Sequence, residues 1–162
     1  MRGCAFTGHR QVRPAHESLI EELLLRGVRY AYDRGCRDFF SGGALGFDTV
    51  AARAVLALRS EHSDVRLNLI LPCPDQDEKW GYAARCEYQK ILRLADSVEY
   101  ASESYTKYCM HKRNRRLVEL ADMIIAYYDL SGSGGTAYTV EFAKKAGREV
   151  HNLFPNLEKT AK

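Results

Sequence analysis

The sequence predicts one α/β domain with a Rossmann-like, three-layer fold, in which helices cover both faces of a mostly parallel sheet. Two observations support this fold class. Short apolar runs alternate with longer helical stretches along the 162 residues, and parallel strands need such crossover helices. Two glycine-rich turns, at residues 41–48 and 131–136, each follow an apolar run and precede an alanine-rich stretch.

Short runs of apolar residues predict the strands. In chain order, these are residues 4–7, 37–40, 65–71, 97–100, 123–128 and 149–153. The run at 123–128 is continuous and apolar, which is typical of a strand buried on both faces. Gly8 follows the first strand and Pro72 stops the third, so the predicted ends coincide with residues that break strands.

The stretches between the strands carry apolar residues at helical spacing. They predict helices at residues 14–35, 50–58, 78–94, 106–120 and 137–146. Pro14 suits a first helical turn, while Gly35 and Gly147 end two of the helices. We expect residues 1–155 to form a single domain, and the charged C-terminal tail, residues 156–162, to fray.

The composition is that of a soluble globular protein, with 46% hydrophobic and 28% charged residues. No apolar run approaches the roughly 20 residues that cross a bilayer, and the N-terminus does not resemble a signal peptide. The five cysteines are scattered without a CxxC pair, which favours free thiols and a cytoplasmic location. The net charge of +3 is too small to argue for nucleic-acid binding.

The two glycine turns predict a phosphate-binding site. A strand, a glycine turn and a helix together present backbone N–H groups at the positive end of the helix dipole. In a parallel sheet the ligand lies beyond the carboxyl ends of the strands. Residues 8–10, 41–48, 72–80 and the turn after Asp129 are all expected at that edge. They hold most of the glycines and unusual polar residues of the chain.

Several standard sites are missing from the sequence. Neither turn is a GxGxxG dinucleotide motif, and no GxxxxGK[ST] occurs, so ordinary NAD binding and P-loop hydrolysis are not expected. The five histidines share no metal-ligand spacing. We therefore expect neither a metal nor a cofactor.

The first turn reads Ser-Gly-Gly-Ala-Leu-Gly-Phe-Asp and is followed by Ala51-Ala52 and Ala57-Leu58. This pattern resembles the SG-x-A-x-G-x-D…A…AL signature of the SLOG superfamily, which includes the DNA-processing protein DprA and the LOG-type phosphoribohydrolases. Further matches, in the same order, cover nearly the whole chain. They are Thr7-Gly8-His9-Arg10, Gln76…Trp80, Arg113-Asn114 and Gly134-Gly135-Thr136. Together they look like the YpsA-like branch, small single-domain proteins of bacteria and their phages.

The resemblance implies a domain that binds nucleotides or nucleotide-derived ligands, such as a nucleoside phosphate or an ADP-ribose-like molecule. LOG enzymes cleave N-glycosidic bonds and carry the signature PGG-x-GT-x-x-E. In this chain Thr139 stands at the position of that glutamate. The nearest carboxylate belongs to Glu141, two residues later, which places it about 200° further around the helix. We therefore favour a protein that senses or sequesters its ligand.

Two alternatives stay open. One is a LOG-type nucleoside monophosphate phosphoribohydrolase, with Glu141 or an acid near Asp48 as the catalytic carboxylate. The other is single-stranded DNA binding like that of DprA, for which residues 111–116 supply a short basic patch. Because related pockets are often completed by a second subunit, we also expect a homo-oligomer.

The phosphates are expected to lie on N–H groups of both turns, with Arg10 and Arg113 as counter-charges. Asp48 either contacts a ribose or caps a helix, and Trp80 either stacks on a base or fastens a loop. The candidate ligand-binding residues are Gly8, His9, Arg10, Ser41, Gly42, Gly43, Gly46, Asp48, Gln76, Trp80, Arg113, Asn114, Ser131, Gly132, Ser133, Gly134, Gly135 and Thr136.

Overall fold

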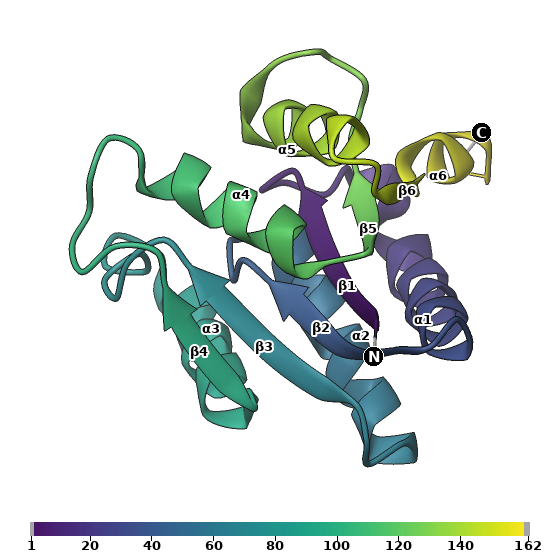
Figure 1. The fold of residues 1–162 in the computed structure, drawn as a ribbon, viewed down its shortest axis with the longest axis horizontal. Helices are drawn as coiled ribbons and strands as arrows, with labels where there is room; N and C mark the ends of the chain where they lie inside the picture. The colour runs from purple at the N-terminus through teal and green to yellow at the C-terminus, as the bar shows by residue number, and fades with distance from the viewer. Residues whose placement is uncertain (1, 161–162) are drawn as a thin grey trace.

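The computed structural model describes residues 2–160, whose strands form one six-stranded sheet (Figure 1). The strands are β1 (Arg2–Gly8), β2 (Cys36–Ser41), β3 (Arg66–Leu71), β4 (Ser97–Tyr100), β5 (Met123–Tyr127) and β6 (Glu149–Asn152). Their order is β4-β3-β2-β1-β5-β6, and every neighbouring pair is parallel. The predicted Rossmann-like α/β class is confirmed, and the sheet is parallel throughout.

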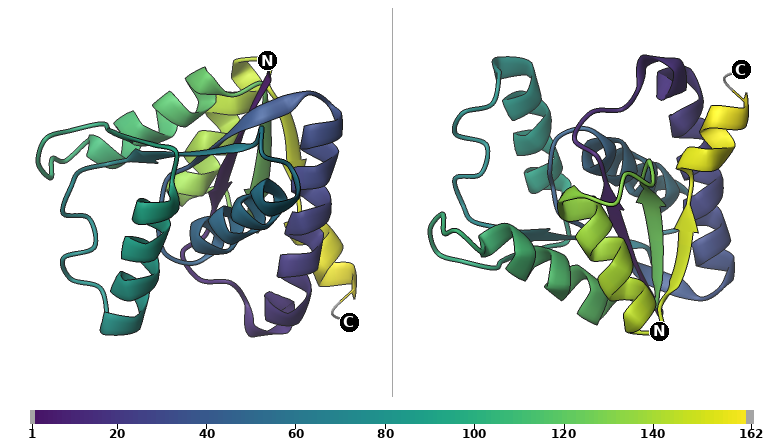
Figure 2. Two further views of the ribbon diagram at one scale, coloured as in Figure 1. Left: turned by 90° about the horizontal axis from the view of Figure 1, so that it is seen from below. Right: turned by 90° about the horizontal axis from the view of Figure 1, so that it is seen from above.

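Two layers of helices enclose the sheet. The helices are α1 (Glu17–Asp33), which follows the 3-10 turn η1 (Pro14–His16), α2 (Phe47–Glu61), α3 (Tyr82–Leu94), α4 (Cys109–Leu120), α5 (Gly134–Lys145) and α6 (Phe154–Thr160). Helices α1, α2 and α3 cover one face, whereas α4 and α5 cover the other (Figure 2). No helix within residues 2–160 is long and apolar enough to cross a bilayer.

The central strand β1 divides the core between these two layers. Successive side chains of a strand point to opposite faces of the sheet. Phe6 accordingly belongs to the large apolar cluster that contains Leu24 of α1 and Phe47 of α2. Its neighbour Ala5 packs in a second cluster with Leu117 of α4. The alternation within one strand therefore joins both helical layers to the sheet.

The direction in which strands are added reverses beside β1. The chain proceeds from β1 outward to β4, and then returns through α4 to place β5 on the other side of β1. In open parallel sheets such a reversal leaves a crevice at the carboxyl ends of the two strands. The segments after β1 and β5, together with the first turns of α4 and α5, lie at this crevice.

The part of the predicted tail up to Thr160 forms a helix, where the sequence predicts fraying, while residues 161–162 lie outside the described residues. Residues up to Thr160 form α6, in which Phe154 and Leu157 are buried. Glu158 accepts a hydrogen bond of 2.7 Å from Arg13, and its carboxylate lies 2.9 Å from Nε2 of the buried His16. Two apolar anchors and these polar contacts hold α6 in place.

Several helix starts also differ from the sequence expectation, and α2 begins at Phe47, three residues before its predicted start. Helix α3 begins at Tyr82 and α4 at Cys109, later than predicted, whereas α5 begins three residues earlier, at Gly134. Before α3, the N–H groups of Glu78 and Trp80 donate to carbonyls three residues back, in isolated turns. In α5, glycines adopt the first helical positions although their intrinsic helix propensity is low.

Candidate functional site

A cavity of about 410 Å³ lies at the carboxyl end of β1, next to the first turns of α2, α4 and α5. Its walls come from the segment after β1, the start of α2, one side of α4 and the first turn of α5. Ten of the predicted residues line it, namely Gly8, His9, Arg10, Asp48, Arg113, Asn114, Ser133, Gly134, Gly135 and Thr136. The fold therefore brings residues from four distant segments of the chain to one site.

Other lining residues were not predicted as candidates, namely Phe6, Thr7, Ala44, Met110, His111 and Leu117. Three of these lie on α4 close to the predicted pair Arg113-Asn114. Met110 and Leu117 are three residues from Arg113 and Asn114, respectively, and His111 is three residues before Asn114. Residues at this spacing share a helix face, so the periodicity of α4 was a usable signal.

The second glycine turn leaves the start of α5 open. Ser133, Gly134 and Gly135 are exposed, and the N-cap Ser133 makes no side-chain capping bond. Within residues 2–160 no group accepts a hydrogen bond from the N–H groups of Gly134, Gly135 or Thr136. Three unpartnered N–H groups at the positive end of a helix dipole attract an anion.

The first glycine turn is filled by the protein's own groups. The N–H of Gly43 donates to Ser41 Oγ at 3.2 Å, and the N–H of Ala44 donates to Asp48 Oδ2 at 3.1 Å. At the start of α2, the N–H of Phe47 donates to the carbonyl of His9 at 3.2 Å. These bonds occupy three N–H groups that the sequence analysis had assigned to phosphate. Only Ala44 and Asp48 of this turn face the cavity.

Asp48 is a buried carboxylic acid in the cavity wall. It lies in the first turn of α2, whose N-cap is Gly46, so Asp48 does not cap the helix. Its side chain is held through Oδ2 by Ala44, while Oδ1 has no hydrogen-bond partner among the described residues. Burial raises its pKa to about 6, although Arg113 and Arg10 oppose the increase. Burial penalises the charged carboxylate more than these two cations favour it.

Arg113 is a buried cation that organises the opposite wall. Its Nη1 donates to the carbonyl of Gly42, and its Nε donates to Asn114 Oδ1 at 2.7 Å. Burial lowers its pKa, and the nearby Asp48 carboxylate partly offsets this effect. Arg113 thus links the first glycine turn to Asn114, and it holds both in place from α4.

His9 joins the end of β1 to the second glycine turn. Its Nε2 accepts a hydrogen bond of 3.0 Å from the backbone N–H of Asp129. The same Nε2 lies 3.1 Å from Asp129 Oδ1, so His9 contacts both the backbone and the side chain of Asp129. Asp129 Oδ1 in turn accepts from the N–H of Ser131 at 3.0 Å, and hydrogen bonds from Ser131 lower the pKa of Asp129. Arg10, the next residue after His9, is exposed at the cavity.

The YspA SLOG family matches residues 6–155 of the chain. The chain belongs to this family. It is 28% identical to the SPbeta prophage-derived protein YoqJ of Bacillus subtilis over 153 residues, which cover 86% of this chain and 85% of YoqJ. It is 30% identical to a UPF0398 protein of Halalkalibacterium halodurans over 144 residues, which cover 85% of this chain and 70% of the relative.

The SLOG fold of this chain is also similar to solved structures. DNA processing protein A from Helicobacter pylori, whose single-stranded DNA binding mode was the subject of that structure, superimposes with a TM-score of 0.65 at 20% identity. The match covers 99% of this chain and 73% of that chain. TM1055, a structural-genomics target, gives a TM-score of 0.57 at 17% identity, with 98% of this chain and 81% of that chain covered. At these identities the likeness establishes the fold.

Some of the candidates taken from the SLOG motifs support the site from outside. Gln76 Nε2 donates to the carbonyl of Gly43 at 3.3 Å and to Tyr88 Oη at 3.1 Å. Trp80 packs edge-to-face on Tyr88, with ring centroids 5.1 Å apart. Neither lines the cavity, so Trp80 fastens a loop. The predicted residues that lie outside the cavity lining are Ser41, Gly42, Gly43, Gly46, Gln76, Trp80, Ser131, Gly132 and Glu141.

The position that carries glutamate in the LOG-type SLOG signature is closed here. Thr139 is buried, and its Oγ1 donates to the carbonyl of Gly135 at 2.8 Å. Glu141 is exposed on α5 and does not line the cavity. Asp48 is the one carboxylate among the residues that line it.

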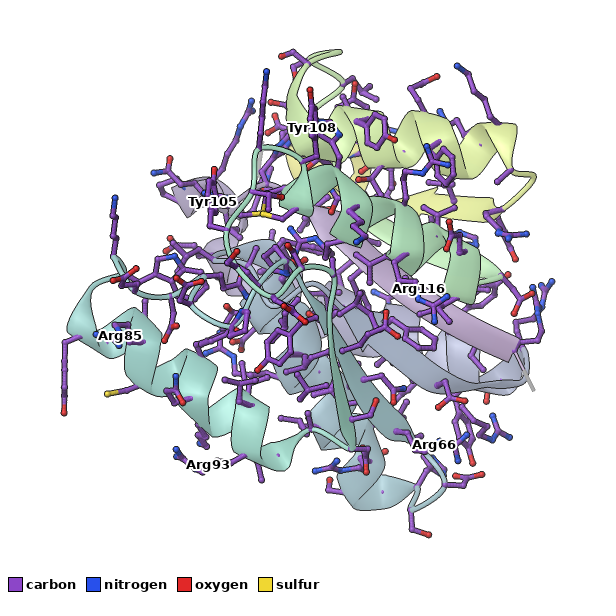
Figure 3. All side chains as sticks on the ribbon, turned by 60° about the vertical axis from the view of Figure 1, so that its left-hand side comes forward. Arg66, Arg85, Arg93, Tyr105, Tyr108 and Arg116 are labelled. Atoms are coloured by element: carbon purple, nitrogen blue, oxygen red, sulfur yellow. The ribbon has the colours of Figure 1, made fainter. Side chains whose placement is uncertain are left out.

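Exposed tyrosines precede α4, which lines the SLOG cavity, and exposed arginines lie on α3, on the other face of the sheet. Tyr105 and Tyr108 project from the segment that leads into α4, while Arg85 and Arg93 lie along α3 (Figure 3). The tyrosines are 68% and 65% exposed, respectively. Within the described part of the chain, no three His, Cys, Asp or Glu side chains are arranged to hold a metal ion.

Proposed function

We propose that this protein binds a small nucleotide or nucleotide-derived ligand, such as a nucleoside phosphate or an ADP-ribose-like molecule, and senses or sequesters it. The observation that carries the proposal is a single cavity with an open helix N-terminus on one side and a buried, incompletely bonded Asp48 on the other. Membership of the SLOG family is consistent with a nucleotide-like ligand.

The phosphate belongs at the start of α5. The free N–H groups of Gly134, Gly135 and Thr136 are donors for phosphate oxygens, and Arg10 is an exposed guanidinium at the same cavity. The cavity volume of about 410 Å³ lies within the range of about 300–1,000 Å³ that is usual for small-ligand pockets. Met110 and Leu117 add apolar surface for the less polar part of the ligand.

Binding without cleavage is the form of this activity that the residues favour. Hydrolysis of an N-glycosidic bond needs a carboxylate beside the sugar to act as acid, base or electrostatic partner. Thr139 occupies the expected position of that carboxylate, and Glu141 lies outside the cavity. Asp48 is the residue that would have to take this part if the ligand were cleaved.

Thermal-shift measurements with AMP, ADP and ADP-ribose test the proposal. A ligand present at 100 times its Kd stabilises the folded state by about 2.7 kcal/mol, so we expect at least one of the three to raise Tm by several degrees. Arg10→Gln should reduce this shift. Arg26→Gln, which removes an exposed arginine of α1 away from the cavity, is the matched control and should leave the shift unchanged.

Chromatography of the incubated nucleotide separates binding from cleavage. Recovery of intact ligand is the expected result, and release of free adenine would instead establish the hydrolase. If a deoxythymidine oligomer raised Tm while none of the three nucleotides did, single-stranded DNA binding would replace the proposal. Mass spectrometry of small molecules released from the purified protein then identifies the natural ligand.

A further inference from the structure

Two buried polar groups with opposite hydrogen-bonding capacity face the proposed ligand cavity. Asp48 comes from the start of α2 and Asn114 from the middle of α4, and both line the cavity. Their side chains are 6% and 8% exposed, respectively. Buried polar groups are nearly always hydrogen-bonded, so any bonding capacity left unused here indicates what the cavity is built to accept.

Asp48 has an unused acceptor. Oδ2 accepts the N–H of Ala44, which fixes the orientation of the carboxyl group. Oδ1 is shielded from solvent and has no partner among the described residues. A buried acceptor without a donor costs about 1–3 kcal/mol. A ligand that donates a hydrogen atom to Oδ1 recovers this free energy.

Asn114 has an unused donor. Arg113 has only donors, so the atom of Asn114 that it contacts at 2.7 Å is the amide oxygen. The amide nitrogen Nδ2 is thereby turned away from Arg113. It lies beside Gly135, where a methyl group in place of the glycine hydrogen would come within 3.5 Å of it. No described residue accepts a hydrogen bond from Nδ2. Unlike Asp48 Oδ1, Nδ2 is not fully buried, so this donor is open to solvent and to a ligand.

We propose that Asp48 and Asn114 bind neighbouring hydroxyl groups of a ribose-type sugar, so that the site selects ribonucleotides over deoxyribonucleotides. This inference rests on the proposed nucleotide binding and names the part of the ligand that these two residues recognise. Arg113 donates a hydrogen bond to Asn114 and lies close to Asp48 at Gly42, so one buried side chain is next to both the acceptor and the donor.

The chemistry of the alternatives favours a sugar diol. A dianionic phosphate has no hydrogen atom to donate to Asp48, and its negative charge repels the ionised Asp48 carboxylate. An exocyclic amino group of a base donates but does not accept, so a base would satisfy both atoms only by pairing that group with a neighbouring ring nitrogen. The deoxy analogues of AMP keep this base edge, so their titration separates sugar recognition from base recognition. A hydroxyl group both donates and accepts, and two vicinal hydroxyl groups satisfy Oδ1 and Nδ2 together.

Calorimetric titration of AMP, 2′-deoxy-AMP, 3′-deoxy-AMP and 2′,3′-dideoxy-AMP tests the proposal. Sites built to bond a hydroxyl group discriminate strongly against analogues that lack it. We expect the dideoxy compound to bind at least 10-fold more weakly than AMP, and at least one monodeoxy compound to show part of that loss. Equal affinities for AMP and the dideoxy compound would overturn the proposal while leaving nucleotide binding intact.

Asp48→Asn and Asn114→Ala locate the effect. In Asp48→Asn, the amide oxygen replaces Oδ2 as acceptor for Ala44, so a donor replaces Oδ1. We expect this variant to bind AMP about as weakly as wild type binds the dideoxy compound, and to lose the discrimination between them. Glu22→Gln, at an exposed carboxylate of α1, is the matched control and should keep the discrimination between AMP and the dideoxy compound.

Two further outcomes keep the test decisive. If no adenine nucleotide binds to wild type, the proposed function itself fails, and the titrations of deoxy analogues are not reached. Circular dichroism and Tm show whether Asp48→Asn is folded. If the folded variant still discriminates AMP from the dideoxy compound as wild type does, the proposal that Asp48 recognises the sugar is wrong. Asn114→Ala removes the donor Nδ2 and tests independently whether this group recognises the sugar.

Discussion

The two glycine turns look alike in sequence but differ in what their backbones offer to a ligand. In the first turn, side chains from elsewhere in the chain bind the carbonyls of Gly42 and Gly43, and a side chain at either position would collide with neighbours. In the second turn, a side chain at Gly132 or Gly134 would meet no atom within 4 Å. The first turn is an internal support, and only the second presents an open surface.

This difference shows that glycine serves two purposes in one fold. Around Gly42 it lets α4 approach the backbone closely enough for Arg113 to bond a carbonyl. At the start of α5 it keeps side chains away from N–H groups that have no partner in the protein. Substitutions in the first turn should therefore change stability, and substitutions in the second should change ligand binding.

The largest effect is expected for Gly46→Ala in the first turn. Gly46 has a φ of +79°, and a Cβ atom there would collide with the backbone of Arg10. A strained left-handed residue together with a backbone clash is expected to lower the free energy of unfolding by about 3–5 kcal/mol. Urea denaturation measures this change. A loss below 1 kcal/mol would contradict the view that the first turn is tightly packed.

A smaller change, of opposite sign, is expected for Asp48→Asn. Between its ordinary pKa of 3.8 and its raised pKa of about 6, Asp48 binds more protons in the folded than in the unfolded state. Stability therefore falls as the pH rises through this range, by up to about 3 kcal/mol at pH 8. The variant, which cannot ionise, should be more stable than wild type by about 1–3 kcal/mol at pH 8.

Urea denaturation of both proteins at pH 4, 6 and 8 measures this difference in the free energy of unfolding, which should shrink as the pH decreases. Arg113 and Arg10 are the cations that favour the charged form of Asp48. If the variant were less stable than wild type at pH 8, the charge of Asp48 would be a net contributor to folding, contrary to the burial of its carboxyl group.

Gly135→Ala in the second turn should weaken binding without loss of stability. Gly135 lies in the first turn of α5 and has no positive φ, so alanine fits the backbone and favours the helix. Its methyl group would enter the space beside Asn114 Nδ2. We expect about 10-fold weaker AMP binding by calorimetry and an unchanged or slightly raised Tm. Unchanged affinity would place the ligand elsewhere.

The smallest effect is expected for Ser133→Ala. A serine at a helix N-cap usually contributes about 1 kcal/mol through its side-chain hydrogen bond. Ser133 makes no such bond, so thermal unfolding of the ligand-free variant should show a change below about 0.5 kcal/mol. A full capping loss would mean that the start of α5 is closed in solution and not available to an anion.

Much of the fold could be predicted, because it depends on local patterns. Alternating apolar runs and helical stretches located the strands, and their succession implied a parallel sheet. The short helix α6 escaped prediction because only Phe154 and Leu157 are buried along it. Two apolar residues do not establish a helical period, and the contacts of Glu158 with Arg13 and His16 span more than 140 positions.

Most of the segments that line the cavity could be predicted, but the different hydrogen bonding of the two turns could not. The ends of β1 and β5 and the first turns of two helices were expected to meet. The first turn is closed by Arg113, which lies 71 positions beyond Gly42, and by Gln76, 33 positions beyond Gly43. No local pattern shows such bonds. The carboxylate of Asp48 was a candidate, whereas its unpartnered Oδ1 depends on the packing around it.

The reversal of strand order beside β1 also determines when the cavity is completed during synthesis. β1 emerges from the ribosome first and can pair with β2 early, but its other edge must await β5, more than 110 residues later. The wall formed by α5 emerges later still, and α6, which packs against the segment after β1, is made last. A nascent chain that ends before Met123 therefore has Asp48 and Arg113 but lacks residues 133–136, which complete the lining of the cavity. The cavity at which we propose ligand binding is therefore assembled from residues made early and late in synthesis, from Phe6 to Thr136.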